Sequence, residues 1–190
     1  MRITETQIPG LLVLEPERRD DHRGWFAETY SAGTLARHGL EAVFVQDSHS
    51  FTYREGTVRG LHFQNNPKAQ TKLVRCTRGA VWDVAVDLRR GSPAYARWFA
   101  AALTAENKRQ LWIPKGFAHG VLTLTDNCEV QYKLDELYAH ESDRAIRWDD
   151  PQIGIKWPAA APVLSEKDAS APLLKDSDAN FVFGAEGGRQ

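Results

Sequence analysis

The sequence contains few cysteines and no long apolar run. Its two cysteines, Cys76 and Cys128, each lie inside an apolar strand-like run and form no C-x-x-C spacing. Two such cysteines make neither a zinc site nor a disulfide framework, so we expect two reduced, mostly buried thiols. The amino terminus, MRITETQIPG, lacks the apolar core of a signal peptide. We therefore expect a cytoplasmic protein with no membrane partner.

The chain also lacks an excess of either charge. Lys and Arg number 24 against 25 Asp and Glu, which gives a formal net charge of −1. No large basic field exists to hold nucleic acid non-specifically, so we expect no nucleic-acid partner. Internal repeats and low-complexity segments are absent as well. A chain of 190 residues is long enough for one well-filled core, and we expect a single domain over residues 1–190.

Short strand-like runs separated by turn signals account for most of the sequence. We expect strands over residues 11–16, 44–51, 58–64, 96–104, 110–114, 119–125 and 129–138, with two more in 71–93. The turn at Arg78 and Gly79 separates these last two. Eight or more strands at this spacing predict an all-β barrel or sandwich.

Helix is expected to be a minor component. Ser31 is placed to cap a short helix that ends near Gly39, and Ser165 is placed to cap a second. From about residue 147 the composition changes, because RWDDPQIGIKWP is rich in Pro, Gly and Trp. We expect this C-terminal segment to pack back on the barrel, and only residues 185–190 to be disordered.

The stretch RGLHFQ, residues 59–64, carries a guanidinium, an imidazole and a carboxamide within six residues. Because side chains alternate along a strand, we expect His62 and Gln64 to face one side and Arg59 the other. A lone strand histidine is more often structural. Three further reactive side chains lie on other expected strands: Lys72, His119 and Tyr132. The combination indicates a site in the mouth of a barrel.

The stretch PKGFAHG places Pro114, Gly116 and His119 in the pattern P-x-G-x-x-H, which resembles the second motif of the cupin superfamily. The first cupin motif supplies H-x-H, but here LHFQ provides His62 and replaces the second histidine by Gln64. Two histidines and an amide are a poor ligand set for a catalytic divalent metal. We therefore expect a cupin-like barrel that holds no metal and no cofactor.

Without a metal, such a pocket can still carry out proton chemistry. His62 can act as a general base because its unperturbed pKa lies near neutrality, and Asp168 is a candidate to orient its ring. Lys72 can place a positive charge against a developing enolate oxygen. Tyr132 can donate a proton from the far side of a planar intermediate. Taken singly, Tyr132 is more often a packed aromatic and Lys72 a solvated charge; their joint occurrence favours catalysis.

Eight blocks of sequence, in order, resemble the dTDP-4-dehydrorhamnose 3,5-epimerase family. They are RGWFAETY, FVQDSHS, VRGLHFQ, AQTKLVRCTRGAVWDVAVDLRRGSP, ENKRQLWIPKGFAHG, QYK, RWDDPQIGIKWP and LSEKD. The resemblance runs from about Gly24 to Leu174. It implies a metal-free cupin jelly roll that forms a homodimer with exchanged strands. It also implies a dTDP-sugar substrate, dTDP-4-dehydro-6-deoxy-D-glucose, whose carbons 3 and 5 flank a ketone.

The resemblance also implies roles for individual residues. His62 matches the family's base, Tyr132 its acid, and Asp168 the dyad partner of His62. Lys72 and His119 match family residues that lie near the sugar ketone and hydroxyls. Arg59, Gln46 and Asp47 match residues that contact the nucleotide sugar. Tyr138 is expected to stack on the nucleoside base, and Lys167 to bind a phosphate. Contacts at the nucleotide end, reached across a dimer, are Arg23, Phe26 and Glu28.

Three positions depart from the family pattern. Ser48 stands where Asn is usual, Thr71 where Gly precedes the lysine, and Asp143 where Glu is usual. Ser48 and Asp143 belong to the expected substrate-binding set, so the departures bear on substrate choice.

Three alternatives remain open from the sequence. One is a mono-epimerase that inverts carbon 3 or carbon 5 alone, in an antibiotic deoxysugar pathway. Another is a metal-dependent cupin that uses His62 and His119. The third is a non-catalytic sugar-binding module, which would have no need for His62, Lys72 and Tyr132 together.

Overall fold

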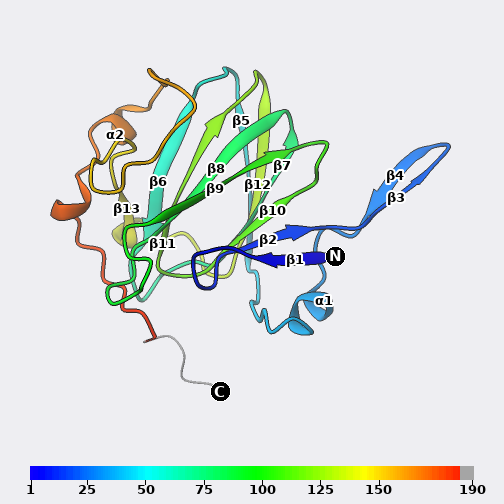
Figure 1. Cartoon of the computed structure of the whole chain (residues 1–190), viewed down its shortest axis with the longest axis horizontal. Helices are drawn as coiled ribbons and strands as arrows, with labels where there is room; N and C mark the ends of the chain where they lie inside the picture. Colours follow the sequence, from blue (N-terminus) through cyan, green and yellow to red (C-terminus); the bar gives the residue numbers. More distant parts are fainter. Residues whose placement is uncertain (185–190) are drawn as a thin grey trace.

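A computed structural model describes residues 1–184 and places most strands in two antiparallel sheets (Figure 1). The six-stranded sheet runs in the order β1 (Arg2–Glu5), β2 (Leu12–Glu15), β10 (Gln110–Ile113), β7 (Lys72–Arg78), β12 (Cys128–Leu134) and β5 (Gln46–Thr52). The five-stranded sheet runs in the order β13 (Asp143–Ala145), β6 (Val58–Gln64), β11 (Phe117–Thr123), β8 (Ala80–Asp87) and β9 (Trp98–Thr104). The all-β prediction is confirmed.

The two sheets face each other across an apolar core, as alternating strands require. The six-stranded sheet contributes Val74, Cys76, Leu111, Ile113 and Val130 to this core. The five-stranded sheet contributes Val81, Ala85, Leu103, Phe117 and Val121. Both Cys76 and Cys128 are buried free thiols, as expected from the sequence. Burial raises the pKa of the Cys76 thiol to about 11, so this thiol stays protonated at neutral pH.

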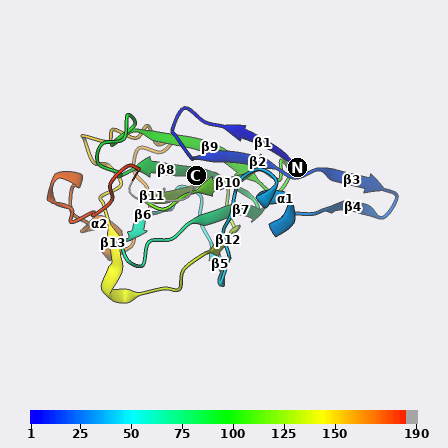
Figure 2. The same ribbon diagram turned by 90° about the horizontal axis from the view of Figure 1, so that it is seen from below.

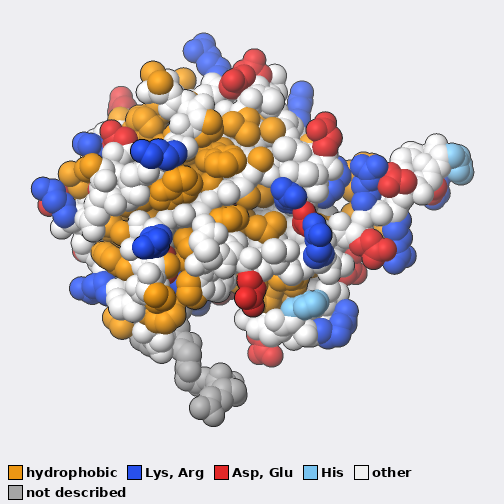
Figure 3. All heavy atoms as spheres, in the orientation of Figure 1, with side chains coloured by type: hydrophobic (Ala, Val, Ile, Leu, Met, Phe, Trp, Pro, Cys, Tyr) orange, Lys and Arg blue, Asp and Glu red, His pale blue; other side chains and the backbone are white. Residues whose placement is uncertain are grey.

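The C-terminal segment covers part of the outer face of the five-stranded sheet, on the side of β6 and β13 (Figure 1). Its apolar side chains pack against those of β6 and β8 in one cluster: Leu61, Phe63, Val84, Val86, Ile146, Ile153, Leu174 and Phe181. On the face shown in Figure 3, apolar side chains gather over β8 and β9. There Trp82, Trp98 and Ala100 are partly buried against the same cluster. The segment therefore lies on the barrel and carries α2 (Glu166–Ala169) and the 3-10 turn η2 (Leu174–Asp176), while the 3-10 turn η1 (His140–Ser142) precedes β13.

Both predicted helix caps are present. The Ser31 hydroxyl accepts from the backbone N–H of Thr34 at the start of α1 (Ala32–Ala36), and the Ser165 hydroxyl accepts from that of Asp168 in α2. Within residues 1–184 no helix is long and apolar enough to cross a membrane. The expected disorder of residues 185–190 lies outside the described residues.

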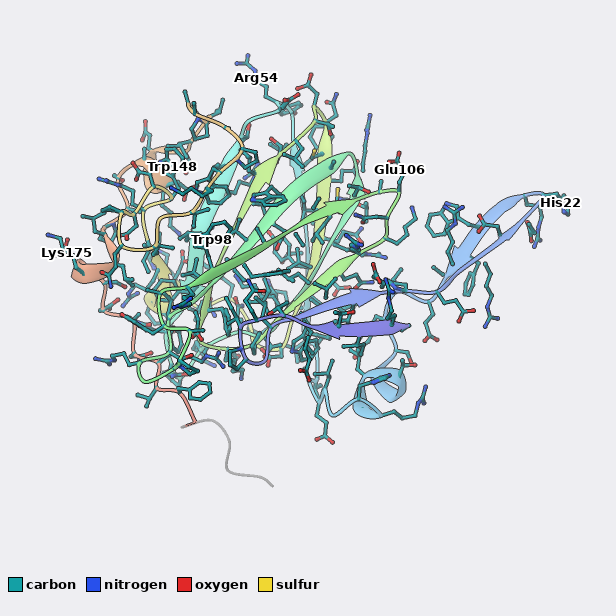
Figure 4. All side chains as sticks on the ribbon, viewed as in Figure 1. His22, Arg54, Trp98, Glu106, Trp148 and Lys175 are labelled. Atoms are coloured by element: carbon teal, nitrogen blue, oxygen red, sulfur yellow. The ribbon has the colours of Figure 1, made fainter. Side chains whose placement is uncertain are left out.

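The sequence patterns did not predict four short strands. β1 and β13 are edge strands, and β3 (Arg18–Asp21) and β4 (Gly24–Ala27) form a separate hairpin. The residues of β1, β3 and β4 are largely exposed and those of β13 are half-buried, so none of these strands alternates between buried and exposed positions over its length. The hairpin projects from the end of the molecule opposite α2 (Figures 1 and 2), and Figure 4 shows His22 at its tip, away from the barrel.

Candidate active site

Two adjoining cavities lie between the sheets. The first has a volume of about 330 Å³ and the second about 380 Å³. Four side chains line both: His62, Lys72, Tyr132 and Lys167. His62 comes from the five-stranded sheet, whereas Lys72 and Tyr132 come from the six-stranded sheet. The four therefore mark the junction of the cavities, with groups supplied from opposite walls.

Arg59 and His62 both line the first cavity, so the strict alternation expected along residues 59–64 was wrong at Arg59. The register between β6 and β11 shifts just after His119, which changes the face that each side chain takes. Gly60 makes this possible, because its φ is 132° and a Cβ there would lie 2.6 Å from the Cα of Gly120. Only glycine fits this close approach.

His62 forms a dyad with Asp168. The distance from His62 Nε2 to Asp168 Oδ1 is 2.5 Å, and Asp168 is 3% exposed. Burial raises the pKa of this carboxyl, but the hydrogen bond and charge of His62, with Ser165 and the Gly60 amide, outweigh burial and hold the pKa below its usual value. The carboxylate is thus ionised at neutral pH and orients the imidazole, as the sequence suggested.

A second histidine–carboxylate pair faces the same cavity. His119 Nε2 lies 3.0 Å from both carboxylate oxygens of Asp83, and Asp83 is fully buried on β8. His119 is the direct cross-strand partner of His62. Sequence reasoning missed Asp83. The available signal was a carboxylate at an inward position of the apolar run VWDVAVD, because an unpaired buried charge is rarely tolerated.

Lys72 brings an ammonium group into the cavities without a direct partner. Within the described residues no hydrogen bond or ion pair holds its Nζ atom. Burial lowers the pKa of Lys72 to about 8, although the negative charges of Asp83 and Asp143 oppose that shift. A partly desolvated cation at this position is suited to an anionic oxygen of a bound ligand.

The mouth of the second cavity carries a polar cluster. The Tyr138 hydroxyl donates to Asp143 Oδ2 over 3.2 Å, and Lys167 Nζ lies 2.5 Å from the same oxygen. Gln46 and Ser48 line this cavity too, and the Gln46 amide donates to the Ser48 hydroxyl. These residues all belong to the substrate-binding set expected from the sequence.

Arg59 is held in the first cavity by uncharged groups. Its Nε donates to the Thr52 hydroxyl over 3.0 Å, and its Nη2 donates to the Phe51 carbonyl over 3.2 Å. Among residues 1–184 no carboxylate forms an ion pair with it. The guanidinium charge therefore remains available to an anionic ligand.

Four expected binding residues do not reach these cavities within one chain. Asp47 lies on the outer face of its sheet, where its carboxylate accepts from Lys133 Nζ over 2.9 Å. The other three belong to the hairpin and the turn after it: Arg23, Phe26 and Glu28. Arg23 pairs with Asp21, and Phe26 is 69% exposed.

The positions that would carry a cupin metal are engaged elsewhere. His62 and His119 each direct Nε2 at a carboxylate. The Gln64 amide bonds to three backbone groups. Within the part of the chain that the structure describes, no group of three or more His, Cys, Asp or Glu side chains is arranged to hold a metal ion.

Comparison with known proteins assigns the family. Residues 5–176 match the sequence model described as dTDP-4-dehydrorhamnose 3,5-epimerase. The enzyme of that name from Salmonella typhimurium is 49% identical over 176 residues, covering 92% of this chain and 96% of that protein. The chain belongs to the dTDP-4-dehydrorhamnose 3,5-epimerase family.

Solved structures of family members share the fold. The Bacillus anthracis epimerase, crystallised with TDP and PPi bound, superposes with a TM-score of 0.89 at 46% identity, covering 90% of this chain and 98% of that one. The Legionella pneumophila enzyme, in complex with dTDP-4-keto-L-rhamnose, gives 0.89 at 44% identity, covering 93% and 94%. The predicted cupin jelly roll of the epimerase family is thereby confirmed.

Proposed function

We propose that the chain inverts carbons 3 and 5 of dTDP-4-dehydro-6-deoxy-D-glucose to give dTDP-4-dehydro-L-rhamnose. The observation that carries the mechanism is the placement of His62 and Tyr132 on opposite sheets, both lining the same two cavities. Inversion needs a proton taken from one face of the sugar ring and returned to the other. A base and an acid on opposite walls meet that requirement.

His62 is the base in this mechanism. Because Asp168 accepts the hydrogen on Nε2, the unprotonated nitrogen of the neutral ring is Nδ1, which takes the proton next to the ketone. The ionised Asp168 then stabilises the imidazolium. A positioned acid or base contributes roughly 10²–10⁴-fold to the rate.

Lys72 stabilises the enolate that proton removal creates. Both acidic protons flank one ketone, so one cation at the ketone oxygen serves both inversions. A single preorganised donor of this kind contributes roughly 10²–10³-fold. His119, held by Asp83, is assigned to a sugar hydroxyl beside it.

The nucleotide end is assigned to the polar mouth. Lys167 lines both cavities and Arg59 lines the first, and a diphosphate lying between them carries negative charge that such groups bind. The exposed ring of Tyr138 is assigned to the nucleoside base, with Gln46, Ser48 and Asp143 beside it.

A homodimer would supply the remaining binding residues. The β3–β4 hairpin projects from the barrel with Trp25 and Phe26 exposed, and a monomer gains nothing from exposing them. Strand β5 is an open edge of the six-stranded sheet. We therefore place the hairpin of one copy against its partner, where Arg23, Phe26 and Glu28 reach the nucleotide end.

Incubation of the protein with dTDP-4-dehydro-6-deoxy-D-glucose in heavy water tests this function. Deuterium and inversion at both carbons support it. Deuterium at one carbon alone would indicate a mono-epimerase. Binding without exchange at either carbon would indicate a sugar-binding module.

A further inference from the structure

Gln64, the residue that stands where a cupin metal motif has histidine, is engaged at every polar atom. It is 3% exposed at the end of β6. Its Nε2 donates to the carbonyl of Lys68 over 2.7 Å and to that of Leu137 over 3.2 Å. Its Oε1 accepts from the N–H of Ala139 over 2.7 Å. All three partners are backbone groups.

Two of those partners flank Tyr138. Gln64 bonds to the residue before it and to the residue after it, while the Tyr138 N–H donates to Gln46 Oε1 over 3.1 Å. Two glutamines thus fix three consecutive backbone positions. Tyr138 itself is 58% exposed, and among residues 1–184 the one hydrogen bond of its side chain is the donation from its hydroxyl to Asp143.

A histidine at position 64 could not make these contacts. A neutral imidazole has one N–H donor, whereas the amide has two and uses both. One of the two part-buried carbonyls would lose its donor, which destabilises the folded backbone there.

We propose that Gln64 is a positioning residue for the nucleotide end of the substrate, because it holds the backbone on both sides of Tyr138 and so preorganises that ring at the mouth of the second cavity. The inference rests on the proposed function, in which Tyr138 meets the nucleoside base. Gln64 bonds to no catalytic side chain, so its effect falls on binding and not on proton transfer.

Gln64→Leu removes all three hydrogen bonds and keeps a side chain of similar size. The affinity for TDP then falls roughly 3- to 10-fold, the effect expected when one contacting side chain must be ordered on binding. KM rises by a similar factor, and kcat at saturating substrate stays within about 2-fold.

The neighbouring residue offers a matched control. Asn65 is also buried, and its amide donates to the carbonyl of Asp178 over 3.0 Å and accepts from the N–H of Asn180 over 3.3 Å. Asn65→Leu therefore removes a buried amide whose side-chain bonds go to Asp178 and Asn180 and not to the backbone around Tyr138. It lowers the melting temperature as Gln64→Leu does but leaves the TDP affinity unchanged.

A double-mutant cycle decides between positioning and general damage. In a Tyr138→Ala background, Gln64→Leu has no further effect on TDP affinity measured by calorimetry. An equal loss in both backgrounds, or an equal loss in Asn65→Leu, overturns the proposal. If Gln64→Leu does not fold, Gln64→Glu, which keeps the acceptor and loses both donations, takes its place in the cycle. A wild type that binds TDP but inverts neither carbon refutes the proposed reaction and leaves this cycle measurable.

Discussion

The Nε2 atom of His62 lies 2.5 Å from Oδ1 of Asp168, across 106 residues of sequence. His62 belongs to a barrel strand and Asp168 to α2 in the segment that covers the barrel. The C-terminal segment therefore supplies half of the proposed catalytic dyad as well as apolar packing. In the proposed mechanism, docking of this segment is a condition for activity.

Asp168→Asn should lower kcat by roughly 10²-fold or more, because the imidazolium loses its counter-charge and the ring its fixed tautomer. KM should change little, since Asp168 is assigned no substrate contact. Steady-state kinetics measure both constants. Asp149→Asn, at an exposed carboxylate paired with Arg147, is the control and should retain full activity. An Asp168→Asn enzyme with wild-type kcat would contradict the dyad.

The same carboxylate should affect stability in acid. The pKa of Asp168 is below 3.8 in the folded protein, so its contribution is fully present above that value. It is lost as the pH falls through the folded pKa, because the unfolded state takes up the proton first. The wild-type advantage over Asp168→Asn in free energy of unfolding should therefore shrink below about pH 4. Urea titrations between pH 3 and 6 would reveal a constant difference if the pair were not formed.

Lys72 should give opposite pH trends in activity and stability. In the proposed mechanism its ammonium is needed at the enolate, so kcat should fall as the pH rises through its pKa of about 8. Between that pKa and the unfolded-state pKa of 10.5, the unfolded state binds more protons than the folded state. Lys72 should therefore make the free energy of unfolding increase as the pH rises through this range. Lys72→Met should remove this stability increment and lower kcat roughly 10²-fold or more. Parallel trends in the wild type would contradict the assignment.

Chelation should leave turnover unchanged. Both cavity histidines direct Nε2 at carboxylates, and Gln64 is fully bonded to the backbone. We expect full activity after exhaustive treatment with chelator, with metal content checked by elemental analysis. Activity that is lost and then restored by one specific divalent metal would support the metal-dependent cupin instead.

The hairpin should mediate dimerisation. Light scattering of the wild type should give a homodimer at micromolar concentration, and Phe26→Asp should weaken it by placing a charge in a buried apolar contact. Val182→Asp, at an apolar residue 52% exposed on the C-terminal segment, is the control. An active wild-type monomer would rule out the shared site.

Strands with an apolar pattern were predictable from the sequence, and irregular or exposed ones were not. β7, β8 and β12 carry apolar residues toward the core, so periodicity identified them. β3 and β4 bury almost nothing in a single chain, so no periodicity marks them.

The candidate site shows the same division. His62, Asp168, Lys72 and Tyr132 were recognisable by residue type and family resemblance, and the structure brings them to one pair of cavities. The contacts that depend on local backbone geometry were not recognisable. The register shift at Gly60 turns Arg59 into the cavity, and Asp83 reaches His119 only through strand pairing.

The most direct test of the mechanism compares His62→Ala with Tyr132→Phe by nuclear magnetic resonance of the sugar ring in heavy water. His62→Ala should abolish exchange at both carbons, because the enolate never forms. Tyr132→Phe should still exchange through His62 but return the deuteron to the same face, so that deuterium enters without inversion. Exchange retained in His62→Ala would contradict the account, and equal loss in both variants would contradict the separate role of Tyr132.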